Sequence, residues 1–218
     1  MKLVYITGID QRRNRNKVYD DEDFERVVND LLLHSSDIRQ AYVVALYIGK
    51  YTGLRISETF ALEIDDFNFE SETIRVNKKM VYADKKRTEL SITNAMKSKS
   101  SMAILPFHKD LQIIMKDCFC NHKHNNVISD SKGLYLHPKQ LEYCLWKSSK
   151  ALEINFNYHM LRHTLATKLI INGANIKATQ ELMRHANITT TMNIYTHVNE
   201  TLKRDALYQA IPLKELDK

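Results

Sequence analysis

The sequence predicts an α+β protein that is mainly α-helical, with a few short strands in the middle of the chain. Apolar residues recur at helical spacing before about residue 66 and again after about residue 108. Between these stretches lie short β-branched runs that are typical of strands. With 218 residues, 44% of them hydrophobic, the chain is long enough for one domain with a sizeable core.

The chain is basic, with 32 lysines and arginines against 26 acidic residues and a formal net charge of +6. This balance favours an anionic partner, nucleic acid first. No apolar run approaches the length of a membrane span, and the polar N-terminus does not resemble a signal peptide, so we expect no membrane partner. Three cysteines indicate a reducing, cytoplasmic compartment and no disulfide framework.

Residues 1–20 lack helical periodicity and are interpreted as a basic N-terminal segment or linker. Their basic residues lie close together: Arg12, Arg13, Arg15 and Lys17. Residues 21–218 are predicted to form the domain itself. It opens with a helix from about Asp21 that carries acidic residues in its first turn. The inward positions of this helix are Phe24, Val27, Val28 and Leu31.

The second helix is predicted to begin at Ser36 or Asp37, either of which can cap it, and to run to about Tyr51. Gly53 then breaks the helix, and residues 54–58 open another. Three strands follow, at residues 73–76, 80–82 and 102–105. Basic residues crowd between them: Lys78, Lys79, Lys85, Lys86, Arg87, Lys97 and Lys99. By itself such a run is usually the solvated edge of a hairpin.

Two further helices are predicted after residue 108. Their clustered positions are Leu111, Ile114, Met115 and Cys118 in the first, and Leu141, Cys144, Leu145 and Ser148 in the second. Between them, Cys118, Cys120, His122 and His124 raise the question of a zinc site. The spacing departs from that of structural zinc sites, and alternate residues on a helix diverge. We therefore interpret the tract as an amphipathic helix ending in a polar loop, and assign no metal ligand.

Residues 158–198 carry the densest set of chemically active side chains. Leu161, Leu165 and Leu169 recur every four residues and predict a buried helix face, and Gly173 predicts its end. A second short helix has an inward stripe of Ile176, Thr179, Leu182 and Met183. The groups suited to phosphate chemistry are His159, Arg162, His163, Arg184, His185 and Tyr195. Each alone has an ordinary structural explanation, and only their joint pattern indicates phosphate chemistry.

Four segments closely resemble the signature motifs of the tyrosine recombinases, the integrase family of phages and conjugative elements. They are Thr-Gly-Leu-Arg55-Ile-Ser-Glu58, His159-Met-Leu-Arg162-His163-Thr, Leu182-Met-Arg-His185 and Ile194-Tyr195-Thr-His. The resemblance covers about residues 21–205. It departs from the family at Arg184, where a glycine commonly precedes the second histidine. It implies the family's DNA breaking–rejoining catalytic fold, with a small antiparallel three-stranded sheet on one flank.

The resemblance also implies six catalytic residues: Arg55, Lys97, His159, Arg162, His185 and Tyr195. The two arginines would stabilise charge on the phosphate oxygens, with Glu58 shaping the site beside the first of them. Tyr195 would attack the phosphate, His159 would act as general base and His185 would contact the phosphate.

Lys97 would protonate the departing 5′ oxygen. Its segment, Lys97-Ser-Lys-Ser-Ser, resembles the lysine hairpin of the family, although Ala103 stands where many relatives have an arginine. Lys99 remains the alternative general acid, because residues two apart on a strand share a face.

A double-stranded DNA attachment site is the implied partner, contacted by Lys78, Lys79, Lys99 and Arg184. The resemblance further implies a homotetramer on DNA, accessory DNA-bending proteins and a nucleoid-associated location. Since one phosphoester replaces another, the reaction needs neither a metal ion nor ATP, and no cofactor is expected. The upstream core-binding domain of the family, which clamps DNA, is expected to be absent.

Three alternatives fit the sequence less well than a recombinase. A catalytically silent DNA-binding regulator on the same fold would lack catalytic residues, whereas this chain has all six. A type IB topoisomerase shares the chemistry, but the signature motifs favour a recombinase. A zinc hydrolase built on His159 and His163 would need a glutamate between them, where Met160 and Leu161 stand.

Overall fold

The structure, a computed structural model, describes residues 18–34, 36–94, 103–120, 122–192 and 194. Its helices are α2 (Asp21–Leu33), α3 (Asp37–Thr52), α4 (Ile56–Thr59), α5 (Lys109–Cys120), α6 (Pro138–Leu152), α7 (Tyr158–Ile171) and α8 (Ile176–Met183). Its strands are β1 (Phe67–Asn68), β2 (Thr73–Val76), β3 (Lys79–Val81), β4 (Ser91–Thr93) and β5 (Ala103–Pro106). The predicted class, mainly helical with a small antiparallel sheet, is confirmed.

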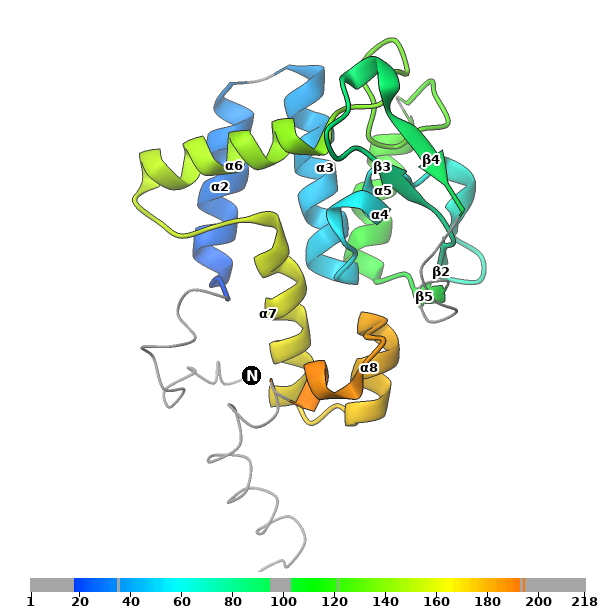
Figure 1. Ribbon diagram of the computed structural model, residues 1–218, viewed down its shortest axis with the longest axis vertical. Helices are drawn as coiled ribbons and strands as arrows, with labels where there is room; N and C mark the ends of the chain where they lie inside the picture. Colours follow the sequence, from blue (N-terminus) through cyan, green and yellow to red (C-terminus); the bar gives the residue numbers. More distant parts are fainter. Residues whose placement is uncertain (1–17, 35, 95–102, 121, 193, 195–218) are drawn as a thin grey trace, which may run out of the picture.

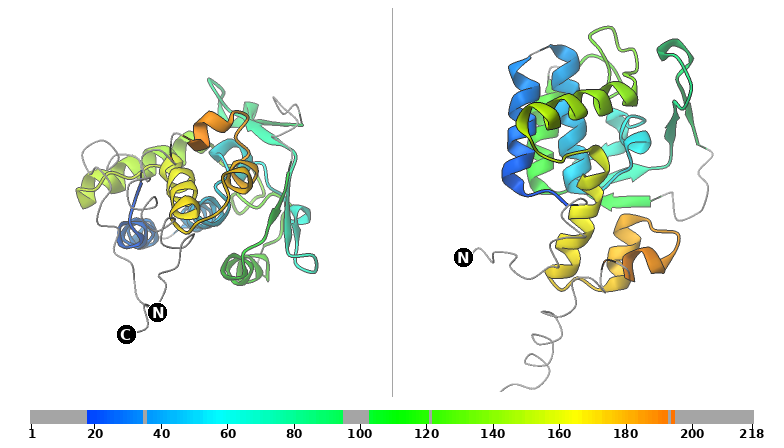
Figure 2. Two further views of the ribbon diagram at one scale, coloured as in Figure 1. Left: turned by 90° about the horizontal axis from the view of Figure 1, so that it is seen from below. Right: turned by 60° about the vertical axis from the view of Figure 1, so that its left-hand side comes forward.

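The helices form the body of the fold, and the strands gather on the flank opposite α2 (Figure 1). Helix α2 packs against α3 and α6, α3 packs against α7, and α7 packs against α8. Figure 2 shows α8 beside α7 at one end of the molecule, with the β3–β4 hairpin at the other. The candidate residues therefore lie on three segments that pack against one another: the α3–α4 junction, α7 and α8.

The helix boundaries depend on local caps, of which the sequence predicted those at Ser36 and Gly53. The side chain of Asp20 accepts a hydrogen bond from the Asp23 N–H at the start of α2, and Ser36 caps α3 in the same way. Gly53 ends α3 in the left-handed region, at a φ of 62°. The four predicted inward residues of α2, Phe24, Val27, Val28 and Leu31, are all buried. These local predictions are confirmed.

The sheet has three strands, as predicted, but one of them is not a strand that was predicted. Its order is β1-β2-β5, with Thr73 paired to Pro106 and Val76 to Ala103 in the antiparallel β2–β5 register. The predicted strand at residues 80–82 is not part of it. Instead β3 pairs with β4 as a separate hairpin and packs against α4, where Met80 is buried. Neither the two-residue β1 nor the three-residue β4, in which Ile92 and Thr93 are half-buried, was predicted.

One close approach fixes α7 against α3. A Cβ added to Gly49 would lie 2.7 Å from both Tyr158 Oη and Leu161 Cδ1, so a side chain there would push the helices apart. The Tyr158 hydroxyl donates to the Ala45 carbonyl oxygen at 3.2 Å and lies 2.7 Å from Thr59 Oγ1. A single buried phenol therefore joins the first turn of α7 to both α3 and α4.

The predicted buried face of α7 is only partly correct. Leu161 is buried, but Leu165 and Leu169 are half-buried. The buried residues instead occur around the helix: Tyr158, Met160, Leu161, Arg162, Thr164, Ala166 and Ile170. The reason is that α7 has neighbours on several sides, since α3 and α8 pack against it and the Thr164 hydroxyl accepts a bond from the Tyr19 N–H.

The Cys/His tract takes the predicted form, a helix that ends in a polar loop. Leu111 and Met115 are buried on α5. After it, His122 Nε2 lies 2.7 Å from the Asn126 carbonyl oxygen, and His124 Nε2 lies 3.1 Å from that of Ser131. Within the described ranges, no group of three or more His, Cys, Asp or Glu side chains is arranged to hold a metal ion. No described helix is both long and apolar enough to cross a membrane.

Candidate active site

Arg55 lies at the junction of α3 and α4, as the first residue before the α4 helix. Glu58 holds it twice: one carboxylate oxygen accepts the Arg55 backbone N–H at 2.8 Å, and the other accepts Arg55 Nη1 at 3.0 Å. Glu58 is buried, whereas the Arg55 side chain is 43% exposed. The expected pairing of the two residues is present, and it leaves part of the guanidinium open to a ligand.

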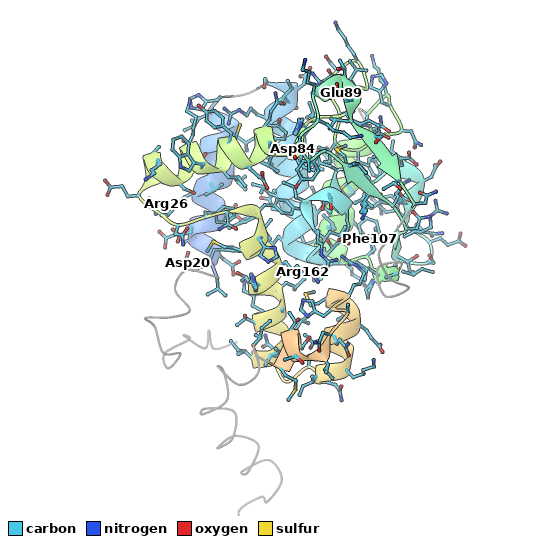
Figure 3. All side chains as sticks on the ribbon, viewed as in Figure 1. Asp20, Arg26, Asp84, Glu89, Phe107 and Arg162 are labelled. Atoms are coloured by element: carbon cyan, nitrogen blue, oxygen red, sulfur yellow. The ribbon has the colours of Figure 1, made fainter. Side chains whose placement is uncertain are left out.

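Arg162 is buried on α7 and joins two other segments. Its Nη1 donates to the Gly53 carbonyl oxygen at 2.7 Å, and its Nη2 donates to the Met183 carbonyl oxygen. Figure 3 shows Arg162 near the centre of the molecule, where α7 passes the α3–α4 junction. Burial, and then the nearby cations Arg55 and Arg184, lower the pKa of Arg162 to about 9. The side chain thus remains a cation at neutral pH.

Arg184 does not face outward, as a DNA-contacting residue would. It ends α8 at a φ of 52°, in the left-handed region that favours glycine. Its side chain is 1% exposed, and Nη2 lies 2.5 Å from a carboxylate oxygen of Glu58. Arg184 is therefore not in position to contact DNA, contrary to the sequence expectation. A side chain buried against an internal carboxylate is not available to a phosphate backbone.

Lys78 also differs from its expected DNA-facing position. Its ammonium lies 2.5 Å from Glu63 and 2.9 Å from Asp66, and its side chain is 11% exposed. Two carboxylates, of which Asp66 is fully buried, therefore hold it, because the chain turns back between β2 and β3 toward the segment before β1. Lys79 is half-buried on β3, and its contact with DNA stays a prediction. Lys97, Lys99 and Tyr195 lie outside the described residues.

His185 directly follows the end of α8. Its N–H donates to the Gln180 carbonyl oxygen at 3.0 Å, and the Gln180 side chain donates back to the His185 carbonyl oxygen at 3.1 Å. The ring Nδ1 lies 2.9 Å from the hydroxyl of the buried Thr191. Burial and the nearby cations, Arg162 first and then Arg55, lower the pKa of His185 to about 4. The imidazole is therefore neutral at pH 7.

His159 lies in the first turn of α7 and is exposed. Its ring is perpendicular to that of His163, with centroids 4.5 Å apart. Partial burial, and then the charges of Arg162 and Arg55, lower the pKa of His159. The sequence placed His163 among the groups suited to phosphate chemistry but assigned it no catalytic role, although it lies one helical turn after His159. A neutral imidazole at this exposed position is able to accept a proton.

The predicted groups on the three segments share one electrostatic environment. Arg55 and Arg162 each lower the pKa of both His159 and His185. Two guanidinium groups beside two neutral imidazoles form an arrangement suited to binding an anion and accepting a proton from a neighbouring hydroxyl. Residues more than 120 positions apart in the chain are brought together, since Glu58 and Arg184 are separated by 126 positions.

Comparison with known proteins shows which family the chain belongs to. The sequence model of the Phage integrase family matches residues 17–201 of the chain. The chain belongs to the phage integrase family. The match covers the α3–α4 junction, α7, α8 and the position of Tyr195, so the resemblance seen in the four sequence motifs is confirmed.

Relatives within the phage integrase family are tyrosine recombinases. Tyrosine recombinase XerC of Actinobacillus succinogenes is 29% identical over 187 residues, which are 84% of this chain and 58% of that protein. XerC of Pelotomaculum thermopropionicum is 30% identical over 181 residues, covering 79% of this chain and 54% of that protein. The chain thus spans little more than half the length of these two relatives.

Solved structures share the fold at lower sequence identity. The Tn1549 transposon integrase (residues 82–397), in complex with circular intermediate DNA, has a TM-score of 0.74 at 22% identity. That match covers 89% of this chain and 67% of the other. XerA recombinase has a TM-score of 0.61 at 20% identity, over 90% of this chain and 64% of the other. These likenesses place the described residues in the catalytic fold of the phage integrase family.

Proposed function

We propose that the protein is a site-specific DNA recombinase, or integrase, that breaks and rejoins DNA through a 3′-phosphotyrosyl intermediate. The observation that carries the proposal is the convergence of Arg55, Arg162, His159 and His185 from three separate segments. Family membership supports the same reaction class. No feature of the described residues favours a catalytically silent regulator, because all four of these side chains are present and converge.

In the proposed reaction, the Tyr195 hydroxyl attacks the scissile phosphorus while His159 takes its proton. The bond from phosphorus to the 5′ oxygen breaks, and Lys97 gives that oxygen a proton. The products are a phosphotyrosyl ester at the 3′ end and a free 5′ hydroxyl. One ester replaces another, so the step is reversible, and a 5′ hydroxyl from a second strand reverses it to complete strand exchange.

Arg55 and Arg162 would stabilise the negative charge that grows on the non-bridging oxygens. Arg55 is the more accessible of the two, since Arg162 is buried and gives two donors to backbone carbonyls. His185, neutral at pH 7, would donate one hydrogen bond to the phosphate. Its Nδ1 lies beside Thr191, so Nε2 is the atom assigned to this bond.

The proposed partner is a double-stranded DNA attachment site, bound through Lys79 and Lys99 along the phosphate backbone. The proposal includes no DNA contact by Lys78 or Arg184, because buried carboxylates hold both side chains. We further propose that the protein acts as a homotetramer on DNA, with accessory DNA-bending proteins, at the nucleoid.

Covalent capture tests this proposal. The full chain is incubated with nicked duplexes tiled across the sequences that flank its gene. A nick beside the cleavage position lets the short fragment that carries the free 5′ hydroxyl diffuse away, which traps the adduct. We expect a protein–DNA adduct on denaturing gels, and none with Tyr195→Phe, which keeps the ring but lacks the nucleophilic oxygen. An adduct formed by the phenylalanine variant, or no adduct with any duplex, would contradict the proposal.

A further inference from the structure

The site holds one buried arginine that the proposed reaction does not use. Arg184 takes a backbone conformation that residues with a Cβ rarely adopt, at a φ of 52°. Its side chain is 1% exposed, and its Nε and Nη1 find no acceptor among the described residues. A buried cation with unused donors destabilises a fold. Its presence is therefore better explained by a role in the site than by stability.

The guanidinium of Arg184 is directed at the carboxylate that holds Arg55. Arg184 Nη2 lies 2.5 Å from Glu58 Oε2, and the same oxygen accepts the Arg55 backbone N–H at 2.8 Å. The other carboxylate oxygen accepts Arg55 Nη1 at 3.0 Å. Glu58 is thus held from both sides, and any movement of its carboxylate would also move the Arg55 guanidinium.

A second buried guanidinium, that of Arg162, joins the same two segments. Arg162 donates to the carbonyl oxygens of Gly53 and Met183, which lie two residues before Arg55 and one residue before Arg184. The α3–α4 junction and the end of α8 are therefore joined twice, once by Arg162 through backbone atoms and once by Arg184 through Glu58. Because His185 directly follows Arg184, the second link also fixes where the His185 backbone lies.

We propose that Arg184 is a positioning residue of the recombination site, which acts through Glu58 to hold Arg55 and His185 in register. The inference rests on the proposed function. Arg184 makes no contact with DNA in this role. It offsets the charge of Glu58, so that the Arg55 guanidinium is shared between the carboxylate and the phosphate and is not neutralised by the carboxylate alone.

Substitution of Arg184 separates positioning from DNA contact. Arg184→Met keeps most of the side-chain volume and removes the charge and donors. We expect single-turnover cleavage of the nicked duplex to fall about 10²-fold, because small misplacements of catalytic groups have effects of this size. DNA affinity and its salt dependence should stay within about twofold of wild type, since a buried side chain neutralises no phosphate. Arg184→Lys, which restores a cation beside Glu58, should recover most of the rate.

Arg87→Met is the matched control. Arg87 also lies 2.5 Å from a carboxylate, that of Asp130, but in the turn that contains Glu89, on the far side of the molecule from Arg162 (Figure 3). Its loss removes an ion pair of equal length and should leave the cleavage rate unchanged. An equal loss of rate in both variants would show a general effect of instability and overturn the proposal.

A double-mutant cycle tests the route through Glu58. In a Glu58→Gln background, Arg184→Met should lower the cleavage rate by less than about threefold further, because the two residues act as one unit. Independent, multiplying effects would overturn the proposal, and so would a single variant with an unchanged rate. A fall in DNA affinity with a smaller salt slope would also overturn it, by making Arg184 a phosphate contact.

The wild-type protein distinguishes failure of the proposed function from failure of the proposed role of Arg184. If the wild type forms no adduct, the proposed function fails, and the role of Arg184 fails with it. If the wild type cleaves but Arg184→Met cleaves equally well, only the role of Arg184 fails. Should Arg184→Met lack a cooperative thermal transition, Arg184→Gly decides by the same criteria, because glycine accepts the positive φ at this position.

Discussion

Replacing Tyr158 by phenylalanine tests how firmly the first turn of α7, which carries His159, is held. The Tyr158 hydroxyl is buried, donates to the Ala45 carbonyl oxygen at 3.2 Å and lies 2.7 Å from Thr59 Oγ1. Burial raises the pKa of Tyr158, so the hydroxyl is protonated at neutral pH. Tyr158→Phe removes both contacts and leaves the fully buried Thr59 hydroxyl without this partner.

The expected loss follows from these contacts. A hydrogen bond of this kind contributes about 1 kcal/mol, and an unsatisfied buried hydroxyl costs about 1–3 kcal/mol. Since the ring itself is kept, no cavity term is added. The free energy of unfolding should therefore fall by about 2–4 kcal/mol. For a chain of 218 residues this corresponds to a decrease in Tm of roughly 5–15 °C.

Urea and thermal denaturation measure this loss, with Tyr143→Phe as the control. The Tyr143 side chain is 58% exposed, so its change should stay within about 0.5 kcal/mol. Adding Thr59→Val to Tyr158→Phe should recover part of the stability, because it removes the hydroxyl left without a partner. A Tyr158→Phe variant within about 0.5 kcal/mol of wild type would refute the reasoning, since it would mean that the bond is not what joins these helices.

Two further predictions concern protons. The folded-state pKa of His185, about 4, lies below the ordinary value of 6.5, so the unfolded chain binds more protons between these values and stability should fall as pH falls through this window. Urea titrations from pH 7 to pH 4 should show a shallower fall for His185→Gln, and an unchanged slope would contradict this assignment. Lys97→Ala should slow cleavage of ordinary DNA roughly 10²–10⁴-fold, yet cleave DNA with a 5′-bridging sulfur near the wild-type rate, because a thiolate leaves without a proton. If Lys99→Ala shows this defect and rescue instead, the general acid is Lys99.

Features set by neighbouring residues were predictable from the sequence. The cap at Ser36 and the break at Gly53 depend on a few adjacent residues, and both lie where they were predicted. The pairing of Glu58 with Arg55 is equally local, since the two are three positions apart in one turn. The four signature motifs then carried the resemblance to the phage integrase family, which the match over residues 17–201 confirms.

Features set by distant residues were not predictable in the same way. The direction of the Arg184 side chain depends on Glu58, which is 126 positions away, and sequence alone showed only a departure from the usual glycine. Lys78 was placed in a solvated basic run because its two carboxylate partners lie in a different turn, before β1. Leu165 and Leu169 fit a helical stripe, but α7 has neighbours on more than one side, so the stripe does not mark its buried surface.

The position of His185 depends on polar links more than on packing. Helix α8 has eight residues, too few for a stable isolated helix, and of these only Thr179 and Met183 are buried. Met183 packs against the α3–α4 junction so closely that a Cβ on Gly53 would lie 2.9 Å from its Cε. Arg162 and Arg184 supply the remaining links to the same junction.

The contact between the α3–α4 junction and the end of α8 therefore sets the distance between Arg55 and His185. Substitutions at Gly53, Glu58 or Met183 should disturb several catalytic groups together, although none of these residues is assigned to the phosphate. Substitutions in the core of α2 should instead lower stability without changing the site, since α2 packs on the α3 and α6 side of the fold, away from α8 (Figure 2).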